Sequence, residues 1–134
     1  MNADQALLVE RAREAMGRAY APYSGFAVGA ALLSESGAVH AGANVENASY
    51  PQGQCAEASA IGALIAAGQR RVLAVAVMAD AEGLCPPCGG CRQRLAEFAD
   101  PEAPVHLCGP EGVRRTVTLG ELLPLSFGRE VLGS

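Results

Sequence analysis

The sequence of 134 residues contains no lysine and no tryptophan, and all ten of its basic residues are arginines. Without lysine, the chain can form no Schiff base on a lysine side chain and no phosphate-binding loop of the Walker type. The formal net charge is -4 and the arginines are scattered, so the basic face that a polynucleotide partner requires is missing. The apolar runs, such as residues 73–79, are too short to cross a membrane.

The composition that remains is typical of a globular protein, with 50% hydrophobic and 18% charged residues. A chain of this length favours one domain and can bury a hydrophobic core. Residues 1–14 carry charges throughout, which does not fit the apolar centre of a secretory signal. We therefore expect a single cytoplasmic domain spanning residues 1–134.

Apolar periodicity and turn residues predict an alternation of helices and strands. Helices are expected over residues 4–19, 55–67 and 88–99 and near residue 121, and strands over residues 26–34, 38–44, 72–79, 105–108 and 113–118. Asp4 is the expected N-cap of the first helix, Pro22 is expected to stop it, and Gly68 is the expected stop of the second. The first two strands should form an antiparallel hairpin. The order of elements indicates an α/β fold, a mixed sheet with helices on its faces.

Five cysteines are an odd number, and no export signal accompanies them, so a disulfide framework is not expected. Cys88 and Cys91 lie three residues apart at the start of a predicted helix, where they share one face and can bind one metal ion. The positive end of the helix dipole favours thiolate over thiol there. A redox dithiol of the thioredoxin type and a coincidental pair are the alternatives, and the order of elements does not match thioredoxin.

Cys55 lies at the start of another predicted helix, and together with Cys88 and Cys91 it could hold one Zn²⁺ with a fourth position left open to water. Structural zinc sites usually have four protein ligands, and no fourth ligand is obvious here. Cys85 could close the site, but the two prolines between it and Cys88 make the geometry awkward. Cys108 is expected in the core.

Two histidines and one glutamate are the remaining candidates for a role at the metal site. His40 and His106 are isolated on predicted strands and are interpreted as ordinary strand residues. Glu57 follows Cys55 by two residues, so its side chain should point elsewhere, but it could reach a zinc-bound water as a proton carrier. Three ligands, a glutamate that is not a ligand and a P-C-x-x-C element are typical of zinc deaminases.

Five segments extend this match: residues 23–32 (YSGFAVGAAL), 44–51 (NVENASYP), 55–57 (CAE), 87–93 (PCGGCRQ) and 122–127 (LLPLSF). With them the chain resembles the small zinc-dependent cytidine deaminases over nearly its whole length. Many deaminases share the cysteine elements, whereas the first two segments point to the nucleoside class. The resemblance implies a three-layer α/β/α fold with a five-stranded mixed sheet, and a homotetramer whose active sites are shared between subunits.

The activity that the resemblance implies is hydrolytic deamination of cytidine and 2′-deoxycytidine to the uridine products and ammonia, as in pyrimidine salvage. Cys55, Cys88 and Cys91 would hold one zinc per subunit. Zinc-bound water would be the nucleophile. Glu57 would move a proton from that water to ring N3 and then to the leaving amino group.

Six substrate-binding positions follow from the same resemblance: Phe26, Asn44, Glu46, Tyr50, Ala56 and Phe127. Backbone groups near Ala56 would meet the base edge, and Phe26 would pack on the pyrimidine. Asn44 and Glu46 would bond ribose hydroxyls, and the Glu46 carboxylate would repel a phosphate, which favours nucleosides over nucleotides. Tyr50 and Phe127 would reach the pocket of a neighbouring subunit.

One position departs from the commonest family pattern. Many members with three cysteine ligands carry arginine directly after the catalytic glutamate, where this chain has Ala58. Because Zn²⁺ with three thiolates has a net charge of about -1, a nearby cation would help to offset it. We expect Arg92, together with the two helix N-termini, to supply that charge at the sulfurs.

Two alternative functions stay open at this point. One is the same chemistry on another aminated heterocycle, as in deaminases of the blasticidin type, which share the cysteine elements. The other is a non-catalytic module, held by zinc, that binds a protein or RNA. This second alternative predicts four protein ligands, and its RNA form needs a basic face with aromatic residues that the sequence lacks.

Overall fold

A five-stranded mixed sheet in the order β2-β1-β3-β4-β5 organises the computed structural model, which describes residues 2–133. The strands are β1 (Val28–Ser34), β2 (Val39–Ala43), β3 (Val72–Ala79), β4 (Pro104–Gly109) and β5 (Gly112–Thr118). Strand β1 pairs antiparallel with β2 and with β3, and β4 pairs antiparallel with β5. Only β3 and β4 run parallel within this sheet. The predicted hairpin and the predicted mixed sheet are therefore confirmed.

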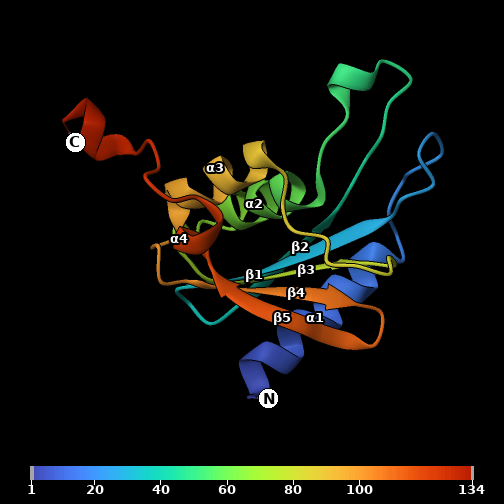
Figure 1. The fold of residues 1–134 in the computed structure, drawn as a ribbon, viewed down its shortest axis with the longest axis horizontal. Coiled ribbons are helices and arrows are strands. Elements are labelled where there is room, and N and C mark those ends of the chain that lie inside the picture. The colour runs from blue at the N-terminus through green and yellow to red at the C-terminus, as the bar shows by residue number, and fades with distance from the viewer. Residues whose placement is uncertain (1, 134) are drawn as a thin grey trace.

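Helices cover both faces of the sheet and make the three layers visible in Figure 1. Helix α1 (Ala3–Met16) lies on one face, and α2 (Ala56–Ala66) and α3 (Gly89–Phe98) lie on the other. Alternate residues of β3 serve the two cores, since Val75 and Val77 pack on the α2 side whereas Ala76 and Met78 pack on the α1 side. The expected α/β/α architecture is confirmed.

The first helix is shorter than predicted at its C-terminal end and begins earlier. Its N-cap is Asn2 instead of Asp4, because the Asn2 side chain accepts a hydrogen bond from the backbone N–H of Gln5 at 2.7 Å. The helix ends at Met16, six residues before Pro22. Beyond it the backbone of Tyr20 hydrogen-bonds to residues 44 and 46, and this pairing holds the chain out of helical conformation.

Two glycines allow helices to pack directly on strands. A Cβ added at Gly29 in β1 would lie 2.0 Å from the carbonyl oxygen of Ala12 in α1. A Cβ added at Gly42 in β2 would lie 2.4 Å from the backbone nitrogen of Ala60 in α2. The second contact fixes α2, whose first residues carry part of the candidate site, against the sheet. Helix α2 ends as predicted before Gly68, which has a φ of 88°.

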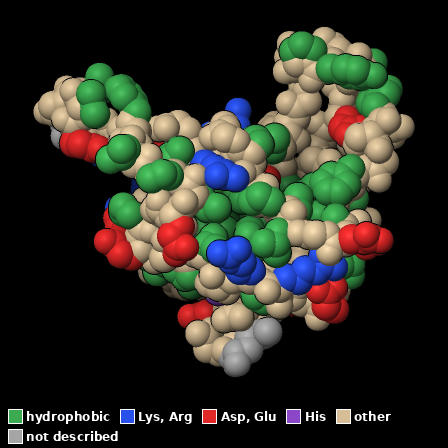
Figure 2. Space-filling view, viewed as in Figure 1, with side chains coloured by type: hydrophobic (Ala, Val, Ile, Leu, Met, Phe, Trp, Pro, Cys, Tyr) green, Lys and Arg blue, Asp and Glu red, His purple; other side chains and the backbone are tan. Residues whose placement is uncertain are grey.

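Three short helical segments complete the chain: η1 (Tyr50–Gln52), α4 (Leu119–Leu122) and η2 (Arg129–Leu132). The loop that carries η1 and the segment that carries η2 project from the body of the molecule (Figure 1). Figure 2 shows hydrophobic side chains on both projections. None of the helices in residues 2–133 combines the length and the apolar character that crossing a membrane requires.

Candidate metal centre and active site

Two helix starts bring three cysteine sulfurs together on one side of the sheet. Cys55 is the N-cap residue of α2, Cys88 is the N-cap residue of α3, and Cys91 is the third residue of α3. The three Sγ atoms all lie within 4.8 Å of one another. The Sγ atoms of Cys55 and Cys88 are 4.0 Å apart. The folded chain therefore brings Cys55 together with the Cys88–Cys91 pair, as the sequence predicts.

The spacing of the sulfurs fits one zinc ion. Tetrahedral coordination with Zn–S bonds of about 2.3 Å places two sulfurs about 3.8 Å apart. Across residues 2–133, no further cysteine, histidine or carboxylate belongs to the cluster. Cys108 is buried in β4, where its thiol donates to the carbonyl oxygen of His106 at 3.6 Å. His106 itself pairs with Thr116 at 2.8 Å, as expected for a strand residue.

The three thiols differ in how easily they lose a proton. The backbone N–H of Cys91 bonds the Cys88 sulfur and lowers the pKa of that thiol. Burial raises the pKa of Cys91, which lies inside the protein, and also that of Cys55. The pKa of Cys88 is therefore shifted in the direction expected at a helix start, whereas at Cys55 burial opposes that shift. Metal ions bind thiolates, so metal binding must release protons, most of all from Cys55 and Cys91, whose pKa values are raised.

Glu57 lies beside this cluster as the second residue of α2, and only 4% of its surface is exposed. A cavity of about 190 Å³ is lined by Val28, Asn44, Cys55, Ala56, Glu57, Val77, Cys85, Pro86 and Cys88. Burial raises the pKa of the Glu57 carboxyl, and the positive charge of Arg94 partly opposes that shift. A carboxyl with a raised pKa is suited to accept a proton and to release it again near neutral pH.

The cation at the sulfurs is Arg94 and not Arg92, which corrects the sequence expectation. Nη1 of Arg94 lies 3.5 Å from Sγ of Cys91. The guanidinium of Arg92 donates instead to two carbonyl oxygens, that of Pro87 at 2.7 Å and that of Leu122 at 2.9 Å. Residues three apart on a helix share a face whereas adjacent residues do not, so Arg94 follows Cys91 on its own side of α3.

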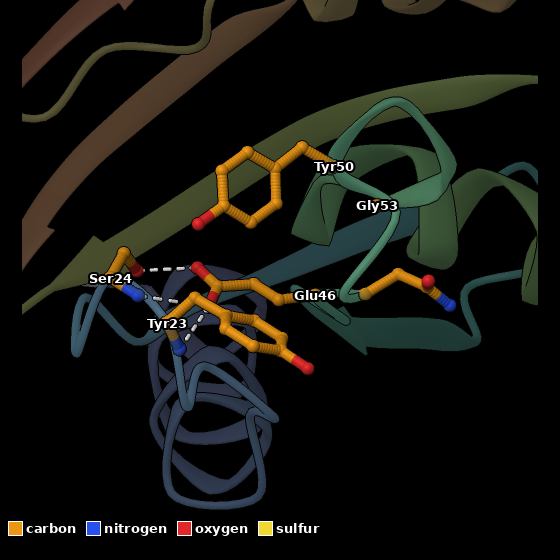
Figure 3. Close-up of a pocket in the computed structure, with 6 residues that line it drawn as sticks. Tyr23, Ser24, Glu46, Tyr50 and Gly53 are labelled. Carbon is orange, nitrogen blue, oxygen red and sulfur yellow. Dashed lines mark hydrogen bonds between the residues drawn. The ribbon is translucent and has the colours of Figure 1, made fainter.

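The six residues expected to bind substrate divide into two groups. Asn44 and Ala56 line the cavity that contains Cys55, Cys88 and Glu57. The other four lie outside the lining of that cavity: Phe26, Glu46, Tyr50 and Phe127. Glu46 and Tyr50 line a separate cavity of about 310 Å³, part of which is shown in Figure 3. Phe127 lies in the C-terminal segment, where its carbonyl oxygen accepts a hydrogen bond from Gln93 at 2.8 Å.

Asn44 and Glu46 are already hydrogen-bonded to the first residue of β1 and to the segment that precedes this strand. The Asn44 amide donates to the carbonyl oxygen of Phe26 at 2.8 Å and accepts from the N–H of Val28 at 2.9 Å. The Glu46 carboxylate accepts from the backbone N–H groups of Tyr23 and Ser24 at 2.9 and 3.1 Å. In Figure 3 it points toward both residues.

Sequence reasoning gave no site role to Arg94 and did not place Cys85 in the wall of the site. The three-residue spacing between Cys91 and Arg94 is the sequence signal that could have identified Arg94. Cys85 lines the cavity without joining the sulfur cluster. No periodic pattern predicts that position, because it lies in the irregular segment between β3 and α3.

Known proteins with matching sequence and structure carry consistent names. The family model for the cytidine and deoxycytidylate deaminase zinc-binding region matches residues 1–107. A cytidine deaminase of Halalkalibacterium halodurans is 45% identical over 127 residues, which cover 95% of this chain and 96% of that protein. One of Mycobacterium tuberculosis is 43% identical over 129 residues, 96% of this chain and 93% of that protein. The crystal structure of cytidine deaminase from Burkholderia pseudomallei is similar with a TM-score of 0.86 at 43% identity, covering 95% of this chain and 100% of that one.

Proposed function

Because the chain belongs to the zinc-dependent cytidine deaminase family, a family of hydrolases, we propose that it converts cytidine and 2′-deoxycytidine to uridine and 2′-deoxyuridine. Each turnover consumes one water and releases one ammonia, as a C–O bond forms at ring C4 and the C–N bond to the amino group breaks. The observation that carries the proposal is the buried Glu57 carboxyl in one cavity with Cys55 and Cys88.

Cys55, Cys88 and Cys91 are the residues that would hold zinc, and a small molecule could reach it from the cavity that Cys55 and Cys88 line. Zinc bound there supplies a coordinated water whose pKa lies near neutrality. Glu57 takes one proton from the attacking water and passes it to ring N3. It then takes the second proton from the hydroxyl formed at C4 and passes it to the amino group, which departs as ammonia while the C4 carbonyl forms. One carboxyl serves attack and departure, since attack needs a base and departure needs an acid.

The chain's own polar groups favour nucleosides over nucleotides as substrates. The Asn44 amide offers two N–H donors and two lone pairs, and its contacts with residues 26 and 28 use one of each. The remaining donor and acceptor can meet a ribose hydroxyl. Backbone groups near Ala56 face the base edge, and Phe26 packs on the ring. The Glu46 carboxylate, whose pKa is lowered by hydrogen bonds from Ser24, stays charged and disfavours a substrate phosphate.

Tyr50 and Phe127 enter the proposal as residues that serve a neighbouring subunit. Each lies on a projecting segment, and 72% of Tyr50 and 56% of Phe127 is exposed. Neither lines the cavity of its own sulfur cluster. A homotetramer in which these side chains complete adjacent pockets would account for both facts. A cytoplasmic location and a role in pyrimidine salvage stay predictions from the sequence.

Replacing Glu57 by glutamine tests the proposed reaction. We expect Glu57→Gln to keep its zinc and to lose at least about 100-fold in turnover of cytidine, because the amide cannot carry a proton. Cytidine absorbance, ammonia release and zinc content are measured on the same samples. Glu102→Gln, at an exposed turn residue, is the matched control and should resemble the wild type.

Each competing function predicts a different result in the same assay. Activity confined to a heterocycle that is not a nucleoside would contradict the substrate class. Bound zinc with no deamination in the wild type would indicate a non-catalytic binding module. Wild-type turnover by Glu57→Gln would exclude the assigned proton carrier.

A further inference from the structure

Ser24 connects two segments that are distant in the sequence. It lies in the turn before β1, followed by Gly25 with a φ of 68°. Its hydroxyl donates a hydrogen bond to Oε2 of Glu46 and accepts one from the backbone N–H of Phe26 at 3.0 Å. The contact with the Glu46 carboxylate is drawn in Figure 3. One hydroxyl thus contacts both a carboxylate and a backbone group that belong to two of the proposed substrate-binding residues.

Further hydrogen bonds hold Glu46 against the turn that carries Ser24. Oε1 of Glu46 accepts from the backbone N–H groups of Tyr23 and Ser24, so both carboxylate oxygens bond this turn. The backbone N–H of Glu46 donates to the carbonyl oxygen of Tyr20 at 2.9 Å, which brings the two segments together. The Ser24 hydroxyl is the only side-chain group within these contacts that touches Glu46 and Phe26 at once. Removing this hydroxyl would therefore release Glu46 and Phe26 from their fixed relative positions while leaving both residues in the chain.

We propose that Ser24 is a positioning residue for the nucleoside, whose hydroxyl sets the placement of the Glu46 carboxylate relative to Phe26. The inference rests on the proposed function, in which Glu46 meets the ribose and Phe26 meets the base. The substrate spans both groups, so an error in their relative placement weakens binding. Ser24 has no place in the lining of the sulfur cavity, so the chemical step itself should be unaffected.

The test compares Ser24→Ala with Ser24→Thr, which keeps a hydroxyl. We expect Ser24→Ala to raise KM for cytidine about tenfold while kcat and zinc content stay within about twofold of wild type, the pattern of lost binding common to ground and transition states. Ser24→Thr should restore most of the affinity. Ser36→Ala is the matched control, because the Ser36 hydroxyl accepts from an N–H two residues ahead in the same way, at the β1–β2 turn.

Two further readouts separate positioning from a general loss of structure. With 2′,3′-dideoxycytidine, which lacks the 2′ and 3′ hydroxyls of the ribose, the rise in KM caused by Ser24→Ala should largely disappear. Amide hydrogen exchange at Phe26 should accelerate in Ser24→Ala, since that N–H loses its acceptor. An unchanged KM, an equal rise for both nucleosides, or unchanged exchange would overturn the inference. A wild type that deaminates neither nucleoside would instead contradict the proposed function, and the exchange at Phe26 would still test the Ser24 contact.

Discussion

Arg94 places a positive charge next to a group of sulfurs that becomes negative when metal binds. Its guanidinium contacts the Cys91 sulfur at 3.5 Å, and its charge partly opposes the burial that raises the pKa of Glu57. Three thiolates around Zn²⁺ leave a net charge of about -1, and partners that bond such ligands typically change metal affinity by about 10–100-fold. The side chain that bonds the Cys91 sulfur is therefore expected to stabilise bound zinc.

Arg94→Met should bind zinc at least about tenfold more weakly than the wild type, because the variant removes both the charge and the N–H donor. Arg94→Lys should be intermediate, since it keeps a charge without the planar donor group. Competition with a chelator measures the affinity independently of turnover. Arg18→Met, at an exposed position outside the site, is the control. Wild-type affinity in Arg94→Met would contradict the role.

At the scale of single residues, the sequence predicts the metal ligands and the proton carrier well. It predicts poorly the side chains that contact these groups. The cysteines and Glu57 follow from spacing and from the family resemblance, and the structure brings all of them together. Arg92 and Arg94 both follow Cys91 closely, and only the direction of each side chain on α3 distinguishes them. The bond between Glu46 and Ser24 joins residues 22 positions apart, so it depends on a tertiary contact that no local pattern contains.

Helices α1 and α2 approach the sheet at glycines, and this close packing fixes the elements around the site. Gly29→Ala would place a methyl group 2.0 Å from the Ala12 carbonyl oxygen, so the helix must move. We expect a loss of about 1–3 kcal/mol in the free energy of unfolding. Gly62→Ala, in α2 with open space around it, is the matched variant and should gain up to about 1 kcal/mol from helix propensity. Urea denaturation measures both, and equal stability of the two variants would contradict the packing.

Element types were predictable from the sequence, whereas several boundaries were not. Turn residues and the apolar run of β3 identify the hairpin and the buried strand correctly. Strand β1 begins at Val28 and not at residue 26, because the Asn44 side chain takes the hydrogen bonds around Phe26 and Val28 that a strand partner would otherwise make. The end of α1 is set in the same way, by the pairing of Tyr20 with residues 44 and 46.

The whole molecule exposes apolar side chains on two separate projections, the η1 loop and the C-terminal segment (Figure 2). Exposed apolar patches of this kind are typical of contact surfaces. We predict that sedimentation velocity gives about four times the chain mass of 13.7 kDa. We also expect that Phe127→Ala lowers cytidine turnover without releasing zinc, since this residue would act in an adjacent pocket. A monomer with full activity would contradict both the assembly and the shared sites.

At the scale of the molecule, the sequence predicted the layers and the mixed sheet but not how the proposed binding residues divide between cavities. Asn44 and Ala56 reach the sulfur cavity within one chain, whereas Glu46 and Tyr50 line a separate one. Sequence motifs identify which residues are candidates for binding substrate. Which cavity each residue lines depends on how loops fold against one another and on what an assembled neighbour would add.

The proposed hydrolysis depends on one zinc held by three cysteines with its fourth position free of protein. X-ray absorption spectroscopy at the zinc edge measures this directly in the metal-loaded protein. We predict about three sulfur scatterers at about 2.3 Å and one lighter scatterer at about 2.0 Å. Four sulfurs would mean that Cys85, which lines the cavity, closes the site, and that result, or the absence of stoichiometric zinc, would contradict the proposed hydrolysis.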